Sequence, residues 1–250
     1  MINDGDLERY SRQILVPGID LEGQSALAAA NVCIVGCGGL GNPAALYLAA
    51  AGVGRLTLVD DDTVALSNLP RQIAFGEADV GRSKVAVLAE QIASRNSTVR
   101  CETVAERLNT DNAPSLLEGV SVVVDGTDNA HSRQVIDAAS AARGLPWVMG
   151  GAVQMSGLNA VFDAKREFGC LRCLDDHPSV LEPDGDCARL GIVGGVVAAV
   201  ALTQVNQVIK LITGAGRLPY GELWLRDFRE DQEQRLRFTP KSDCPRCRAP

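Results

Sequence analysis

Hydrophobic residues follow two alternating patterns through the first 150 positions of the chain. Short apolar runs rich in β-branched residues are typical of buried strands, and the longer segments between them carry apolar residues at helical spacing. The predicted strands are 31–36, 55–60, 98–104, 120–125 and 146–151, and the predicted helices are 39–52, 82–95, 110–118 and a helix starting in the turn 126–129 and ending near 143. This alternation predicts a Rossmann-like, doubly wound and mostly parallel α/β sheet.

The pattern changes on both sides of this unit. Residues 1–25 are polar and predict a helical N-terminal arm. Beyond residue 151 we expect a mixed or antiparallel extension, and the connection 174–190, rich in Pro, Asp and Gly, is the candidate for a mobile loop. The elements of the extension are strands at 158–163, 222–227 and 234–238 and one long apolar helix at 190–213.

Composition narrows the class of protein. The 250 residues are 46% hydrophobic, which supports a full-sized core, and the net charge of −7 argues against nucleic acid or an anionic membrane as the main partner. The first residues lack the basic and apolar regions of a signal peptide, and the apolar stretch 191–203 is shorter than a membrane span. We therefore expect a cytoplasmic protein, in which eight cysteines have roles other than structural disulfides.

A glycine turn follows the first predicted strand. Gly36, Gly38 and Gly41 have the G-x-G-x-x-G spacing, which lets the backbone approach a phosphate while the next helix directs free N–H groups at the anion. Asp60 lies 19 residues after Gly41, where a carboxylate can reach a ribose hydroxyl. The segment predicts a nucleotide site, and on its own it is typical of a nicotinamide- or flavin-binding unit.

Further polar residues follow the carboxyl ends of the predicted strands, where ligands bind in such sheets. The acidic run 60–62 suits either a nucleotide site or a solvated turn, and Arg71 and Lys84 suit either phosphate binding or ordinary surface charge. Asp128 suits either a helix N-cap or a Mg²⁺ ligand. No acid–base constellation involving either histidine is evident.

Two C-x-x-C pairs carry the second strong signal. Cys170, Cys173, Cys244 and Cys247 match a tetrahedral zinc site with four thiolates, and such a closed site is structural rather than catalytic. The 70 residues between the pairs mean that the site would tie the C-terminal segment back onto the body. The alternative is a pair of redox-active dithiols, but neither pair begins a thioredoxin-like βα unit.

The other cysteines divide into two groups. Cys33, Cys37 and Cys101 lie in or beside predicted core strands and turns, where a small buried thiol packs as a hydrophobe. Cys187 lies in the connection 174–190 close to Arg189, and an exposed thiol near a cation can act as a nucleophile.

Taken together, the motifs resemble the MoeB/ThiF enzymes, which activate ubiquitin-like sulfur carriers and are bacterial relatives of ubiquitin-activating enzymes. The resemblance covers residues 5–248. It rests on Arg-Tyr-Ser-Arg-Gln (9–13), the glycine turn (35–41), Ala-Gly-Val-Gly (51–54), Asp-Asp-Asp-Thr-Val (60–64), Leu-Ser-Asn-Leu-x-Arg-Gln (66–72), Val-Gly-x-x-Lys-Val (80–85), Thr-Asp-Asn (127–129), both C-x-x-C pairs and Cys187 before the last long helix.

The resemblance implies a single adenylating domain over 1–250, with a nucleotide-binding half at 1–150 and a half for carrier binding, zinc and dimerisation at 151–250. It implies ATP and Mg²⁺, a small carrier ending in Gly-Gly, a separate sulfur donor and release of pyrophosphate. Carried over by position, Asp60 holds the ribose, and Asn68, Arg71 and Lys84 hold the triphosphate. The other residues of the nucleotide site are Gly36, Gly38, Gly39, Gly41, Asp62 and Gln72. By the same resemblance Asp128 orients Mg²⁺, and Arg12 reaches the phosphates across a homodimer interface.

Three positions depart from the family pattern. Pro70 replaces a glutamine, Gly126 replaces a cysteine, and Gly194-Gly195 replaces Gly-Pro. The segment 150–157 favours a molybdopterin-type carrier over a thiamine-type carrier or another dedicated one. From other classes, a zinc-stapled NAD(P) oxidoreductase would leave Arg71, Lys84 and Asp128 unexplained, and this intact set also argues against a catalytically silent binding module.

Overall fold

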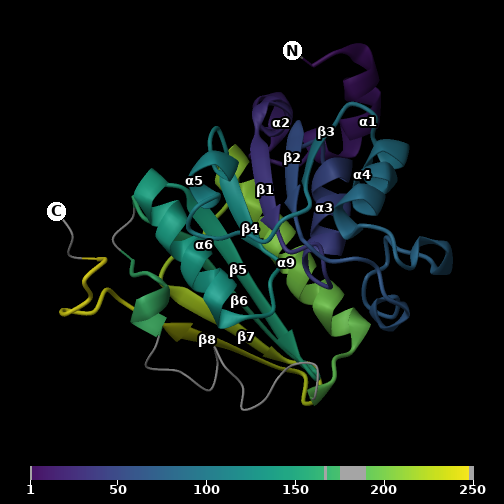
Figure 1. The fold of residues 1–250 in the computed structure, drawn as a ribbon. Helices are drawn as coiled ribbons and strands as arrows, with labels where there is room; N and C mark the ends of the chain where they lie inside the picture. Colours follow the sequence, from purple (N-terminus) through teal and green to yellow (C-terminus); the bar gives the residue numbers. More distant parts are fainter. Residues whose placement is uncertain (1, 166–167, 175–189, 248–250) are drawn as a thin grey trace.

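Eight strands form one sheet in the computed structural model, which describes residues 2–165, 168–174 and 190–247 (Figure 1). The strand order is β3-β2-β1-β4-β5-β6-β7-β8; β1 to β5 are parallel, and β6, β7 and β8 continue the sheet antiparallel. The strands are β1 (Asn31–Val35), β2 (Arg55–Val59), β3 (Arg100–Val104), β4 (Val122–Asp125), β5 (Pro146–Val153), β6 (Ser156–Asp163), β7 (Glu222–Asp227) and β8 (Gln232–Arg237). The predicted doubly wound sheet with an antiparallel extension is confirmed.

Helices cover both faces of the sheet, and the alternation of side chains along β1 shows why. Val32 and Ile34 enter a core shared with α3 and α4, whereas Cys33 and Val35 enter a second core shared with α5 and α6. Figure 1 shows these helices beside the sheet. The helices are α1 (Asp4–Ile14), α2 (Asp20–Ala29), α3 (Gly41–Ala50), α4 (Lys84–Arg95), α5 (Ala113–Leu116), α6 (Ala130–Arg143) and α9 (Gly194–Thr213), with short 3₁₀ turns at Leu66–Asn68, Glu77–Asp79 and Leu171–Leu174.

Helix α9 is long and apolar enough to cross a membrane by length and composition, as are core helices of many soluble proteins. In this fold it packs against β5 and α3. Its buried Gln204 donates hydrogen bonds to the carbonyl oxygens of Asp125 (2.7 Å) and Val148 (3.1 Å), and so links α9 to the end of β4 and to β5. Glycine at 150 makes room for this amide, since a Cβ there would lie 2.6 Å from it.

The helix predicted at 190–213 begins four residues late, at Gly194, for a definite reason. Gln154, in the turn between β5 and β6, bonds to the Gly191 carbonyl and to the Val193 amide and forms a β-bridge with Ile192, so the chain there is not helical. The N-terminal arm is likewise two helices rather than one, and the helix predicted at 110–118 is a single turn. The predicted loop 174–190 lies almost entirely outside the described residues.

Backbone contacts between glycines join the turn after β1 to the turn after β4. Gly36 has a φ of +86°, and a side chain on either Gly41 or Gly126 would overlap its carbonyl oxygen. The amide of Gly126 donates to the Val35 carbonyl at 2.8 Å. Gly126, which departs from the family pattern, therefore lets the two turns approach through backbone alone.

We expect Gly41→Ala to destabilise the protein, because its Cβ would overlap backbone that has no room to move. Overpacking of this kind costs about 1–3 kcal/mol of unfolding free energy. Gly195→Ala is the matched control: its Cβ would meet open space near the start of α9, so unchanged or slightly higher stability is expected. Equal denaturation midpoints for the two variants would contradict this account of the turn.

Candidate active site

A cavity of about 1290 Å³ opens at the carboxyl ends of the parallel strands. Its lining includes most of the predicted nucleotide residues, namely Gly36, Gly38, Gly39, Asp60, Asp62, Asn68, Arg71, Gln72, Lys84 and Asp128. Gly41 lies behind the turn and supports it. The topology brings these residues together because the carboxyl ends of parallel strands share one edge of the sheet.

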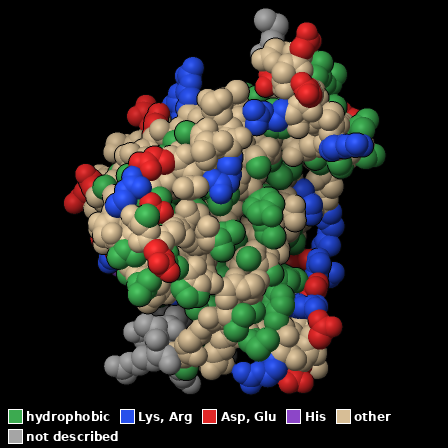
Figure 2. Space-filling view, turned by 90° about the vertical axis from the view of Figure 1, so that its right-hand side faces the viewer, with side chains coloured by type: hydrophobic (Ala, Val, Ile, Leu, Met, Phe, Trp, Pro, Cys, Tyr) green, Lys and Arg blue, Asp and Glu red, His purple; other side chains and the backbone are tan. Residues whose placement is uncertain are grey.

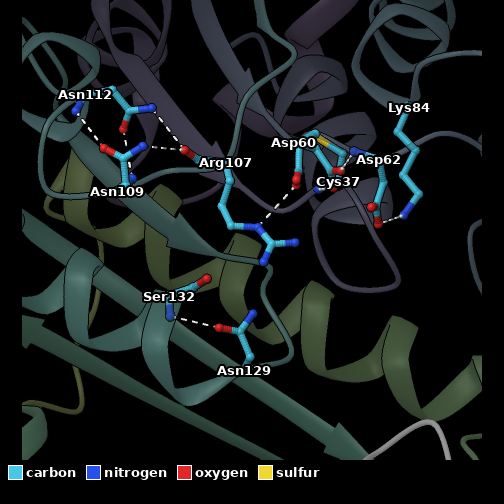
Figure 3. A network of polar contacts seen from close by, with 10 residues as sticks. Cys37, Asp60, Asp62, Lys84, Arg107, Asn109, Asn112, Asn129 and Ser132 are labelled. Atoms are coloured by element: carbon cyan, nitrogen blue, oxygen red, sulfur yellow. Dashed lines mark hydrogen bonds and ion pairs between the residues drawn. The ribbon is translucent and has the colours of Figure 1, made fainter.

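Asp60 fixes the glycine turn as well as facing the cavity. One carboxylate oxygen accepts the Cys37 amide at 2.6 Å, and the other accepts the Asp62 amide at 2.8 Å (Figure 3). Burial raises the pKa of Asp60, while these amide hydrogen bonds and the nearby Lys84 oppose that shift. Each carboxylate oxygen has a second lone pair, so Asp60 can hold the turn and still accept a ribose hydroxyl.

Two cations at the cavity are paired with the acidic run 60–62. The buried Lys84 ammonium lies 2.7 Å from a carboxylate oxygen of Asp62 (Figure 3), and the exposed Arg107 guanidinium lies 3.5 Å from Asp61. The carboxylates hold these cations at the cavity in the absence of a phosphate. The acidic run therefore lines the cavity, although the side chains of Asp61 and Asp62 are exposed.

The loop that carries Arg71 also contains Pro70, and both residues line the cavity. Arg71 donates to the Ser67 carbonyl at 3.0 Å and lines the cavity beside Gly39. The Pro70 carbonyl packs so closely on Gly194 that a Cβ there would overlap it, so this departure from the family pattern lies directly against the start of α9. Nearby Gln72 is 3% exposed, and its Oε1 atom has no hydrogen-bond partner among the described residues, which leaves an acceptor at the cavity wall.

An ion pair at the end of β4 shapes the opposite wall. Asp125 is fully buried and lies 3.1 Å from the Arg133 guanidinium; it also accepts the amide and hydroxyl of Thr127, at 2.9 and 2.6 Å. Burial raises the pKa of Asp125, and the Arg133 charge and the Thr127 hydrogen bonds oppose that shift. Arg133 also donates to the Gly150 carbonyl at 3.0 Å, so it connects β4, β5 and the intervening turn.

The N-cap of α6 is Asn129, whose side chain accepts the Ser132 amide at 2.9 Å (Figure 3). The neighbouring Asp128, for which a capping role was the alternative, therefore does not cap the helix. Its exposed carboxylate lines the cavity and has no bonded partner within the described residues. Hard oxygen ligands of this kind suit Mg²⁺ beside a triphosphate.

The cavity continues away from the glycine turn over the antiparallel strands. Its lining there includes the small and apolar residues Gly151, Ala152, Gly157 and Leu158. Polar side chains also line it, among them Arg226 and, at the start of β8, Gln232 and Gln234. An extended chain with small side chains could fit this groove and bring its end to the nucleotide residues.

Four cysteine sulfurs converge at a second site, away from this cavity. The Sγ atoms of Cys170, Cys173, Cys244 and Cys247 all lie within 4.8 Å of one another, with separations such as 3.6 Å between Cys170 and Cys244. A tetrahedral zinc site with Zn–S bonds of about 2.3 Å places its sulfurs about 3.8 Å apart. The geometry fits a zinc knuckle better than two separate dithiols.

An ion pair also connects the zinc knuckle to helix α6. Arg246, between the last two cysteines, bonds to Asp137 on α6. Burial raises the pKa of Asp137, and the Arg246 charge opposes that shift.

Two predicted residues stand apart from the cavity. Arg12 is exposed near the end of α1 and does not line it, and Cys187 lies outside the described residues. The remaining cysteines fit their predicted packing role: Cys33 and Cys37 are buried, and burial raises the pKa of Cys33 to about 12 and of the partly buried Cys101 to about 11.

Sequence reasoning missed three arginines of the cavity lining, Arg107, Arg133 and Arg226. Arg107 follows β3 at the same carboxyl edge as the predicted ligands, so the rule that identified Asp60 could have found it. Arg133 lies one helical turn into α6 and gives no comparable signal, because its role depends on the buried carboxylate of Asp125.

Known proteins match this chain in sequence and in fold. The ThiF family model matches residues 10–247. The sulfur carrier protein ThiS adenylyltransferase of Escherichia coli (strain K12) is 42% identical over 98% of this chain and 97% of its own length. The adenylyltransferase and sulfurtransferase MOCS3 of Anopheles gambiae is 38% identical over 98% of this chain, which spans only 55% of that longer protein.

Among solved structures, E. coli MccB has a TM-score of 0.83 at 23% identity, covering 98% of this chain and 73% of its own, which shows a shared fold. The sequence matches confirm the resemblance predicted from the motifs. Coverage of nearly the whole chain, together with the glycine turn and cations gathered at one cavity, leads to one conclusion: this chain belongs to the ThiF family and is an adenylyltransferase.

Proposed function

We propose that this enzyme uses ATP to adenylate the C-terminal glycine of a small ubiquitin-like sulfur carrier and releases pyrophosphate. One observation carries the proposal: a single cavity joins the glycine turn and its cations to a groove of small residues over the antiparallel strands. The first part suits a nucleoside triphosphate, and the second suits an extended Gly-Gly terminus. The E. coli relative named for ThiS, 42% identical, supports a carrier of this kind.

The reaction asks the protein to bring two anions together rather than to move a proton. A glycine carboxylate is already ionised near pH 7, so it needs no general base to attack the α-phosphate. Arg71 and Lys84 would stabilise the charge that develops on the α-phosphate and on the leaving pyrophosphate. Asp62 would release Lys84 to the phosphates on ATP binding, while Asp60 holds the turn and the ribose.

Asp128 would hold Mg²⁺, as the donor type and its position at the cavity suggest. When bound, the ion neutralises triphosphate charge. The remaining nucleotide contacts would come from Asn68, Gln72 and the glycine turn.

Two carriers remain candidates. A molybdopterin-type carrier was predicted from the segment 150–157, and a ThiS-type carrier is favoured by the 42% identity to a relative matched over 97% of its length. Sulfur would come from a separate donor. We place the enzyme in the cytoplasm, as a homodimer in which Arg12 of each copy serves the cavity of the other.

Pyrophosphate–ATP exchange tests the proposal directly. Exchange should require a carrier with a free Gly-Gly terminus, and Arg71→Ala or Lys84→Ala should each lower its rate by about 100-fold, because each removes a cation from the reacting phosphates. Arg100→Ala, an exposed arginine at the opposite edge of the sheet, should leave it unchanged. Tight NADH binding without ATP binding would refute the proposal.

Elemental analysis should find one Zn²⁺ per chain, bound by the four cysteines of the knuckle. Cys244→Ala should release the metal and lower the thermal midpoint by roughly 5–10 °C, which corresponds to a loss of about 2–3 kcal/mol in a chain of this size. Cys101→Ala removes a thiol outside the cluster and is the matched control. Purified protein without zinc and with both pairs oxidised would count against the site.

Cys187 is proposed as a thiol that accepts the carrier from its adenylate as a thioester, with AMP as the leaving group. Activation by ATP precedes this step, so Cys187→Ala should leave pyrophosphate exchange near the wild-type rate and lower the yield of carrier thiocarboxylate. The two steps are measured separately on the same preparation. Full thiocarboxylate yield from Cys187→Ala would end this assignment.

A further inference from the structure

The motif Arg-Tyr-Ser-Arg-Gln at 9–13 has a role in the proposed function through Arg12 alone, yet its other members make unusual contacts. Tyr10 is 6% exposed, and its hydroxyl accepts a hydrogen bond from Asn96 at 2.8 Å. The same Asn96 amide donates to the Ala49 carbonyl at the end of α3. Gly52, with a φ of +86°, leaves room for the ring, because a Cβ there would lie 2.6 Å from it.

Gln13 makes the second attachment. Its Nε2 atom donates to the Gln24 side chain at 2.6 Å and to the Ala51 carbonyl at 3.0 Å. Gln24 is 1% exposed and donates to the same Ala51 carbonyl at 3.1 Å. A third contact joins the Arg9 guanidinium to the Arg95 carbonyl at 3.1 Å. Three residues of the motif therefore fasten α1 to the C-terminal ends of α3 and α4.

Arg12 projects from the other side of the same helix. Tyr10 and Gln13 are three residues apart and share a face, whereas Arg12 lies about 200° around the helix from Tyr10. Arg12 is exposed, and within the described residues its guanidinium has no hydrogen-bond or ion-pair partner. The motif thus holds one side of α1 against the body through the buried Tyr10 and the partly buried Gln13, while the Arg12 cation points outward.

The segment that carries Arg12 is attached at the edge of the sheet opposite to the cavity of the same chain. The C-terminal ends of α3 and α4 lie at the amino edge of the parallel strands, where β1 begins, and the cavity lies at the carboxyl edge (Figure 1). Large apolar residues beside Arg12 are also exposed, with Leu15 at 74% and Val16 at 46%. Further hydrophobic groups are exposed on the side of the molecule shown in Figure 2, as expected where a second copy of the chain packs.

We propose that Tyr10 and Gln13 are positioning residues for the reaction of the partner copy: they fix α1 so that Arg12 completes the cavity of the other subunit. This inference rests on the proposed function, in which the reaction needs the Arg12 cation. Loss of either attachment leaves the cavity of the same chain intact and impairs the neighbouring one. Such a defect acts in trans, and mixing subunits reveals it.

The test combines each variant with Arg71→Ala chains and measures pyrophosphate exchange after subunit exchange. Gln13→Ala alone should lose at least 10-fold in rate, and an equal mixture with Arg71→Ala should recover about a quarter of the wild-type rate, because half of the dimers are mixed and each has one complete site. Arg12→Ala should behave in the same way. Ser11→Ala, an exposed neighbour whose hydroxyl bonds only to Glu8, is the control and should keep full activity alone.

Recovery by Arg12→Ala but none by Gln13→Ala would overturn the inference, since the Gln13 defect would then act within its own chain. If subunits are shown to exchange but the mixture of Arg12→Ala and Arg71→Ala chains recovers no activity, both this inference and the proposal that Arg12 serves the partner copy would be overturned. Absence of pyrophosphate–ATP exchange in the wild-type enzyme would instead refute the proposed function. If Gln13→Ala fails to fold, the test is repeated with Tyr10→Phe, which removes only the hydroxyl. Sedimentation is used to check that each variant is still a dimer.

Discussion

Backbone contact between two turns is the constraint on which the cavity depends. In this chain the turn after β1 passes so close to the turn after β4 that a Cβ on either Gly41 or Gly126 would overlap the Gly36 carbonyl oxygen. This contact brings the N-terminus of α3 and the start of α6 to the same edge of the sheet. The glycine turn and the carboxylate of Asp128 consequently face one space, although they lie almost 90 residues apart in the chain.

Three cations that line the cavity are paired with carboxylates within the protein. Lys84 pairs with Asp62, Arg107 with Asp61 and Arg133 with Asp125. These cationic side chains are therefore already held in place by carboxylates. The three pairs differ in burial, and this difference assigns their roles. The enclosed pair of Arg133 and Asp125 shapes the wall permanently, because breaking a buried pair leaves an uncompensated charge. The more exposed carboxylates can exchange their cation for a phosphate at little cost.

Much of this arrangement could be predicted from local sequence. The strands, the glycine turn, Asp60 and the cysteine pairs follow from periodicity and spacing, because each signal lies within a short segment. The features that could not be predicted depend on contacts between distant segments. Gln154 delays the start of α9, Asn129 takes the cap that Asp128 could have provided, and Tyr10 finds its partner 86 residues away at Asn96. In each case tertiary packing, rather than local propensity, determines the outcome.

The attachment of the C-terminal segment has a consequence for the edge of the sheet. Strand β8 is the last strand, most of its side chains are exposed, and an edge strand of this kind would ordinarily fray. Here the chain beyond it is fastened twice without any metal: Phe238 packs into the core 5.8 Å from the Phe162 ring, and Arg246 bonds to Asp137 on α6. Detaching β8 therefore requires unpacking of the core beneath α6, which makes this edge part of the cooperative folding unit of the parallel sheet.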